Sequence, residues 1–184
     1  MSNTDHLELK KLLKACLKNN RSAQKKLYMR FYSYSLSICI RYVNSREEAV
    51  EVMNDAFMKV FTYLKQFDLN KPFQPWFRQI IVNCAIDHFK RENKHAGQVD
   101  IDTIMEKGIA ESQLDNISYE EILALVRELP SAYRAVFNLR AIEGYKHEEI
   151  AKMLNITTGT SKSNYFKAKK KLQEYLQVFF EVEK

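Results

Sequence analysis

The sequence predicts an all-α protein with two helical domains joined by a flexible linker, the C-terminal domain containing a helix-turn-helix. Three observations predict this. The 184 residues include only four glycines and three prolines, which favours long uninterrupted helices over sheets. Apolar residues make up 46% of the chain and recur at helical spacing. An acidic segment without periodicity, residues 93–118, separates the periodic parts, so we expect domains at residues 1–92 and 119–184.

The first domain begins with three predicted helices, at Asp5–Lys18, Arg21–Val43 and Arg46–Phe67. The second is rich in aromatic residues, and the third is the most regular segment of the chain. Its apolar residues recur every three or four positions, which predicts one buried face. They are Ala49, Val50, Met53, Ala56, Phe57, Val60, Phe61 and Leu64.

A break follows at residues 68–75, because its two prolines and Asn70 do not continue a helix. Pro75 suits the start of the next helix, where its missing N–H is no loss. We expect that helix at Trp76–Arg91. Its predicted buried residues are Phe77, Ile80, Ile81, Cys84 and either Ile86 or His88.

The C-terminal domain begins its predicted core with a helix at Ser131–Glu143, which Gly144 ends in a conformation that needs positive φ. The expected core stripe of this helix is Ala135, Val136, Leu139 and Ile142.

A helix-turn-helix pattern then follows. A short helix with an inner face of Ile150, Ala151 and Leu154 leads to a turn at Asn155 and Ile156. Either Thr157 or Thr158 can cap the next helix, which we expect to run from Thr158 to Phe180. The inner face of that helix comprises Ser161, Tyr165, Ala168, Leu172 and Leu176.

The opposite face of the same helix is rich in lysine, which suits insertion into the major groove of DNA. The residues expected to touch base edges are Lys162, Ser163, Phe166 and Lys167. Those expected to meet phosphates are Thr160, Lys169, Lys170 and Lys171. The alternative is that these lysines form an ordinary solvated face.

Charge also favours an anionic partner, since the net charge is +6. Residues 93–118 carry a net charge of −3, so the remainder carries +9.

The three cysteines and four histidines are scattered, which argues against a disulfide framework, a metal site or a cofactor. The N-terminus shows no signal peptide pattern and no apolar stretch approaches a membrane span, so we expect a cytoplasmic protein without membrane insertion.

Two segments in the first domain carry a resemblance to a known family. Residues 46–61 and 73–91 look like the polymerase-binding and −10-reading segments of bacterial sigma factors of the extracytoplasmic function (ECF) type. Residues 128–172 resemble the −35-reading domain of the same family. The resemblance extends over about 150 of the 184 residues in the family's order.

The resemblance implies a transcription initiation factor that is not an enzyme. Its partners would be core RNA polymerase, through the β′ clamp helices and the β flap, promoter DNA, and an anti-sigma factor. Polymerase binding would fall to Asn54, Asp55 and Met58. The loop at residues 67–74 would hold a flipped −10 base, and the −10 residues would be Phe73, Trp76, Arg78, Asn83 and Asp87.

Alternatives remain open at this point. Phe73 and Trp76 can be core residues of a helix start, and Asp55 can be a solvated partner of Lys59. Ser161 stands where the family usually has an apolar residue, and Asn164 stands where a basic residue is usual.

The rival function is that of a dimeric helix-turn-helix regulator that binds duplex DNA. A third candidate, a helical nuclease, would need a cluster of carboxylates, which the sequence lacks.

Overall fold

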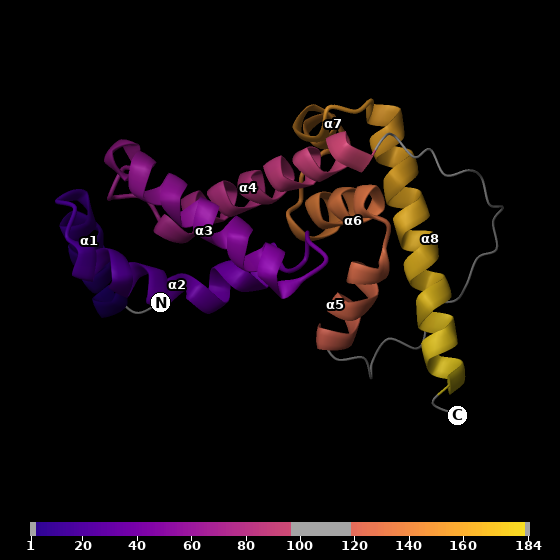
Figure 1. The fold of residues 1–184 in the computed structure, drawn as a ribbon, viewed down its shortest axis with the longest axis horizontal. Helices are drawn as coiled ribbons and strands as arrows, with labels where there is room; N and C mark the ends of the chain where they lie inside the picture. Colours follow the sequence, from indigo (N-terminus) through magenta and orange to yellow (C-terminus); the bar gives the residue numbers. More distant parts are fainter. Residues whose placement is uncertain (1–2, 97–118, 183–184) are drawn as a thin grey trace. The chain divides into compact units, whose positions relative to one another are not determined.

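The computed structural model describes residues 3–96 and 119–182, and Figure 1 shows it as a ribbon. Within these ranges the regular structure is helical, as predicted. The helices are α1 (Asn3–Leu17), α2 (Arg21–Cys39), α3 (Arg46–Tyr63), α4 (Phe73–Ala96), α5 (Tyr119–Glu128), α6 (Ser131–Phe137), α7 (His147–Leu154) and α8 (Thr158–Val182). Packing divides the chain into two compact units, Met1–Ala85 and Ile86–Lys184, with the boundary inside α4.

The ends of the first helices are fixed by side chains and one left-handed residue. After α1 the chain turns at Asn19, whose φ is 56°, in the conformation that commonly ends a helix. The Asn20 side chain accepts a hydrogen bond from the Ala23 N–H at 3.0 Å and so caps α2. Ser45 caps α3 in the same way, while Glu48 accepts from the Asn44 N–H.

The core of the first unit is built where α2, α3 and α4 meet. Phe77 is fully buried, and its ring lies 5.0 Å from that of Phe57 on α3 and 5.7 Å from that of Phe31 on α2. Offset and edge-on aromatic pairs at such distances add stability beyond their buried area. Helix α1 packs against α2 through a stripe of Leu9, Leu13 and Cys16.

Several helix boundaries differ from the prediction. Helix α3 ends at Tyr63 instead of Phe67, and α4 ends at Ala96 instead of Arg91. Helix α2 ends at Cys39 instead of Val43, although Tyr42 and Val43 stay buried in the following turn. Helix α4 begins at Phe73 instead of Trp76, so Pro75 is its third residue. The first turn of a helix tolerates proline because its N–H groups lack intrahelical acceptors.

The second unit packs α5, α6 and α7 against the long helix α8. Helix α5 was not predicted as a separate helix. A side chain of α6 caps the C-terminal end of α5: Arg134 is buried, and its guanidinium donates a hydrogen bond to the Arg127 carbonyl at 2.8 Å. A cation at the C-terminal end of a helix also stabilises the helix dipole.

Helix α6 continues as a π-helical turn at Asn138–Ile142, and this corrects one predicted core residue. A π turn holds an extra residue, which rotates the residues that follow it. Leu139 remains buried, but Ile142 is 37% exposed and is not part of the core. Gly144 then adopts a φ of 81°, as the prediction of a glycine stop requires.

Candidate nucleic-acid interface

The helix-turn-helix has the predicted geometry at its turn. Asn155 ends α7 with a φ of 56°, and the Ile156 N–H donates to the Ala151 carbonyl at 3.0 Å. Of the two candidate caps, Thr157 takes the role, since its hydroxyl accepts from the Thr160 N–H at 3.0 Å. The turn therefore sets the start of α8 firmly against α7.

The inner side of α8 contains one polar residue. Ser161 and Ala168 are both fully buried, and the Ser161 hydroxyl lies 2.9 Å from His147 Nδ1 at the start of α7. A buried hydroxyl needs such a partner, because leaving it unsatisfied would cost about 1–3 kcal/mol. His147 thus compensates for the serine that stands at a usually apolar position.

His147 lies in a positively charged setting. Partial burial lowers its pKa from the ordinary value, and the cations Arg140 and Lys162 lower it further, while Glu148 acts in the opposite direction. The ring is therefore held in its neutral form more strongly than a free histidine.

The outer side of α8 presents the residues predicted to meet DNA. Lys162, Ser163 and Thr160 are exposed, and Phe166 is 49% exposed on the side opposite the buried stripe. An exposed phenylalanine among lysines gives this face both apolar and cationic groups. Both kinds of group can contact base edges in the major groove.

Two of the lysines rest on aromatic rings. Lys167 Nζ lies 5.9 Å from the centroid of the Tyr133 ring, and Lys169 Nζ lies 5.1 Å from that of Tyr165. Lys167 and Lys170 are half-buried. Cation–π contacts of this length hold a side chain in place, so Lys167 is less free than Lys162 to reach outward. Sequence reasoning missed Tyr133, because only tertiary packing brings α6 beside α8.

The predicted polymerase-binding residues share one exposed face of α3. Asn54 and Asp55 are exposed, and Met58 is 65% exposed one turn later. Tyr28 on α2 borders this face, and its hydroxyl donates to Asn54 Oδ1 at 3.0 Å. Burial and the neighbouring Tyr32 raise the pKa of Tyr28, so its hydroxyl stays a donor. Tyr28 thus engages the amide oxygen of Asn54, a contact that no sequence spacing indicated.

The two aromatic residues predicted near the −10 surface differ in exposure. Phe73 is 3% exposed, and its ring packs against those of Phe31 and Phe67 at 5.1 and 5.8 Å. Trp76 is only half-buried and lies 4.7 Å from the Phe67 ring. Phe73 therefore has the core-packing role that the sequence left open, whereas Trp76 keeps part of its surface accessible.

The other three residues predicted for the −10 element lie further along α4. Asn83 and Asp87 are exposed and Arg78 is half-buried. Asn83 Oδ1 accepts from Gln79 Nε2 at 3.4 Å. With Trp76 they provide amide, carboxylate, guanidinium and indole groups on a single helix.

The described residues offer no group of three histidine, cysteine, aspartate or glutamate side chains placed to hold a metal ion. All three cysteines are buried, and burial raises the pKa of Cys39 to about 12, with Cys84 as a second cause. Such a thiol is almost fully protonated near neutral pH and is a poor nucleophile.

None of the helices in the described parts of the chain is long and apolar enough to cross a membrane.

Comparison with known proteins assigns the family. The family model for sigma-70 region 2 matches residues 27–95, and the one for sigma-70 region 4 matches residues 119–172. The two matches lie in the family's order and together span α2 to the middle of α8. The chain belongs to the sigma-70 family. It is a sigma factor of the ECF type, a class of DNA-binding factors for transcription initiation.

Curated relatives agree along nearly the whole length of this sigma factor. It is 25% identical to ECF RNA polymerase sigma factor SigW of Bacillus subtilis, over 92% of this chain and 97% of the relative. It is 27% identical to the ECF RNA polymerase sigma-E factor of Escherichia coli, over 90% of this chain and 93% of the relative. RNA polymerase sigma-H factor of Pseudomonas aeruginosa is 26% identical, with coverage of 82% and 84%.

The fold is similar to that of the sigma factor RpoE of Bartonella quintana, solved in complex with the anti-sigma factor NepR. The TM-score is 0.51 with 19% sequence identity, and the match covers 84% of this chain and 96% of that one.

Proposed function

We propose that this sigma factor binds core RNA polymerase through the exposed face of α3, reads the −35 element through α8, and opens the −10 element with α4. The observation that carries the proposal is that each of these helices buries one stripe of residues and leaves polar residues exposed on another side. On α8 the fully buried Ser161 and Ala168 lie opposite the exposed Ser163 and Phe166.

At the −35 element, α8 enters the major groove, with Thr157 capping its leading end. Lys162 and Ser163 donate to base acceptors, and Phe166 makes apolar contact with a thymine methyl group. Lys170 and Lys171 neutralise phosphates and fix the register without reading sequence.

At the −10 element, the accessible side of the Trp76 ring stacks on a base that has left the duplex. Base–aromatic stacking contributes about 1–3 kcal/mol per base, which favours the separated strand over the duplex. Phe67 and Phe73 pack against the indole, with ring centroids 4.7 and 5.7 Å from it. Arg78, Asn83 and Asp87 line the path of the strand along α4.

Polymerase binding uses Asn54, Asp55 and Met58. The exposed carboxylates of α3 (Glu47, Glu51 and Asp55) make this face acidic, which fits a basic partner surface such as the β′ clamp helices. Region 4 would contact the β flap. An anti-sigma protein is a further proposed partner, since the solved relative from Bartonella quintana is bound to one.

The test uses the purified chain, core polymerase and a library of promoter fragments. We expect the chain alone to bind duplex DNA weakly, and the chain with core polymerase to produce permanganate-reactive thymines around −10 on selected fragments. Core polymerase alone is the control. If the chain alone binds a palindromic site tightly as a dimer and opens no fragment with core polymerase, it is a duplex-binding regulator instead.

A further inference from the structure

The positive charge of the chain is concentrated near its N-terminus. Residues 5–30 contain eight lysines and arginines and two acidic residues, for a net charge of +6, which equals that of the whole chain. These residues form most of α1 and the first half of α2. The match to the family model for sigma-70 region 2 begins only at residue 27, so it leaves out most of this segment.

The cations lie opposite the buried stripe of α1. Leu9, Leu13 and Cys16 are buried, whereas the exposed Lys11 and Lys14 lie on the other side of the helix. Lys18 is exposed in the turn that follows α1.

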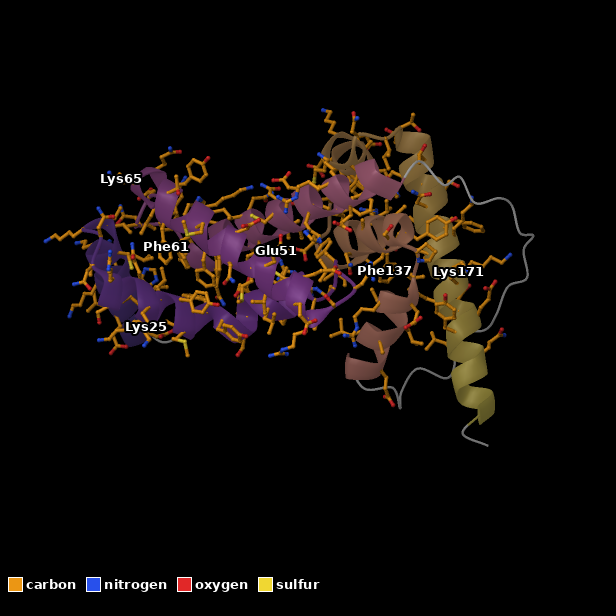
Figure 2. All side chains as sticks on the ribbon, viewed as in Figure 1. Lys25, Glu51, Phe61, Lys65, Phe137 and Lys171 are labelled. Carbon is orange, nitrogen blue, oxygen red and sulfur yellow. The ribbon has the colours of Figure 1, made fainter. Side chains whose placement is uncertain are left out.

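Helix α2 adds further exposed cations. Arg21, Lys25 and Lys26 are exposed in its first two turns, and Lys11 and Lys26 line the same shallow groove between α1 and α2. Figure 2 shows Lys25 at the edge of the first unit, on the side of α2 away from α3. We refer to Lys11, Lys14, Lys18, Arg21, Lys25 and Lys26 together as the α1–α2 basic face.

The two acidic residues of this region, Asp5 and Glu8, leave most of the positive charge of the face unneutralised. Asp5 forms its ion pair with Arg30, outside the face. Lys10 also lies outside it and donates to Asn70 Oδ1 at 2.8 Å. Glu8 is the one carboxylate in the groove. Among the described residues, none of the six cations of the face forms an ion pair.

The α3 face has the opposite charge. Its exposed acidic residues Glu47, Glu51 and Asp55 suit a basic partner, which would repel the α1–α2 basic face. The two faces of the first unit therefore suit partners of opposite charge, and the basic one suits a polyanion.

We propose that the α1–α2 basic face binds the phosphate backbone of duplex DNA, at a place distinct from the −10 and −35 contacts. The proposal rests on the proposed function, which brings promoter DNA to this unit. Lys11 to Lys18 spans about 10 Å at 1.5 Å per residue, a length over which duplex DNA carries about six charges. The face consists of cations without an aromatic member, so it neutralises phosphates without stacking on bases or reading sequence.

The test neutralises three exposed cations in the full-length chain: Lys14→Gln, Lys18→Gln and Lys25→Gln. The holoenzyme's association constant for promoter DNA is measured from 50 to 200 mM salt. Each lost phosphate contact lowers the slope of log K against log salt by about 0.9. We expect a decrease of about 2.7, so that the association constant changes about 40-fold less across this range.

Two control variants make the result specific. Lys→Arg at the same three positions keeps the charge and should keep the slope of the unmodified protein. Lys65→Gln and Arg127→Gln together remove two positive charges from exposed positions outside the face and should also leave the slope nearly unchanged. The decrease should be equal on fragments with scrambled −10 and −35 elements.

An unchanged slope in the Gln variant overturns the proposal, even while promoter opening confirms the proposed function. A loss of affinity for core polymerase with an unchanged slope identifies a protein-docking face, which also overturns it. If the chain does not assemble with core polymerase, the proposed function fails, and the free chain on duplex DNA still tests the face by the same slope. Binding to vesicles containing phosphatidylglycerol but not to duplex DNA assigns the face to a membrane instead.

Discussion

Replacing Trp76 by alanine separates promoter opening from promoter binding. Trp76 is half-buried at the start of α4, with its ring 4.7 Å from Phe67 and 5.7 Å from Phe73. If its accessible side stacks on an unpaired base, the substitution removes about 1–3 kcal/mol from the open complex. This corresponds to about 5- to 150-fold less opening at equilibrium.

The cost to folding has to be kept apart from this effect. Full truncation of a buried tryptophan costs about 3–5 kcal/mol, and a half-buried one roughly half of that. Phe73 is a poorer probe because it is 3% exposed, so Phe73→Ala threatens the whole unit. Phe73→Leu conserves most of the volume and should cost less than about 1.5 kcal/mol. It therefore serves as the matched control for packing.

The assay compares Trp76→Ala, Trp76→Phe and Phe73→Leu with the unmodified chain in holoenzyme. Permanganate reactivity reports opening, a gel shift at low temperature reports closed binding, and thermal denaturation reports stability. We expect Trp76→Ala to lose opening while closed binding persists, Trp76→Phe to recover most of the opening, and Phe73→Leu to open nearly normally. If Trp76→Ala opens DNA as well as the unmodified chain while its melting temperature falls, Trp76 is only a packing residue and the stacking argument is wrong.

Three further predictions concern the other faces. Asp55→Arg should reduce the affinity for core polymerase at least tenfold in a titration, because the new arginine would face a basic partner surface. The circular dichroism spectrum should stay unchanged, because the residue is exposed. Unchanged affinity would mean that this face of α3 does not contact polymerase. Lys162→Ala should lose about 1–3 kcal/mol of discrimination at one −35 position, measured in a promoter library. Lys170→Ala should weaken binding to all sequences alike and lower the slope of log K against log salt by about 1. If both variants keep the promoter preferences and yield of the unmodified chain, α8 does not face the groove as proposed. The folded pKa of His147 lies below its unfolded value of about 6.5, so below that pH the unfolded chain binds more protons. The free energy of unfolding should therefore fall as pH drops from about 6.5 through the folded pKa. In thermal denaturation at pH 7.5 and 5.5, the His147→Gln variant should show a smaller difference in melting temperature than the unmodified chain. An equal difference in the variant would mean that other groups cause the effect.

Local patterns in the sequence were enough to predict most of the fold. The helix-turn-helix followed from an apolar stripe, a turn residue and a threonine cap, and each of these acts within a few residues of its own position. The glycine stop at Gly144 followed from backbone sterics alone. Helix α5 was missed although Ile122, Val126 and Leu129 follow helical spacing, because it directly follows the acidic segment that was assigned to the linker.

The errors and omissions at the site have a different origin. Phe73 and Trp76 are both large aromatics near a proline, and only the packing of α2 against α4 buries one and leaves the other accessible. Ile142 is a different case, because a regular helix would bury it and the local π turn moves it outward. Contacts between helices distant in sequence decide the first case and a backbone irregularity decides the second, and the spacing of apolar residues along a regular helix contains no information about either.

The pair of His147 and Ser161 shows how a departure from a family pattern can be structurally neutral. Seen alone, a serine at a buried position of α8 should weaken the contact with α7. The structure places a ring nitrogen 2.9 Å from its hydroxyl, and the two partners come from the first turns of both helices. A hydrogen bond is directional, so it fixes the angle and register of α8 on α7 where an apolar contact would allow sliding. Burial and the cations Arg140 and Lys162 lower the pKa of the His147 partner in this bond. We therefore expect the contact between α7 and α8 to weaken in acid, which an apolar contact at the same place would not do.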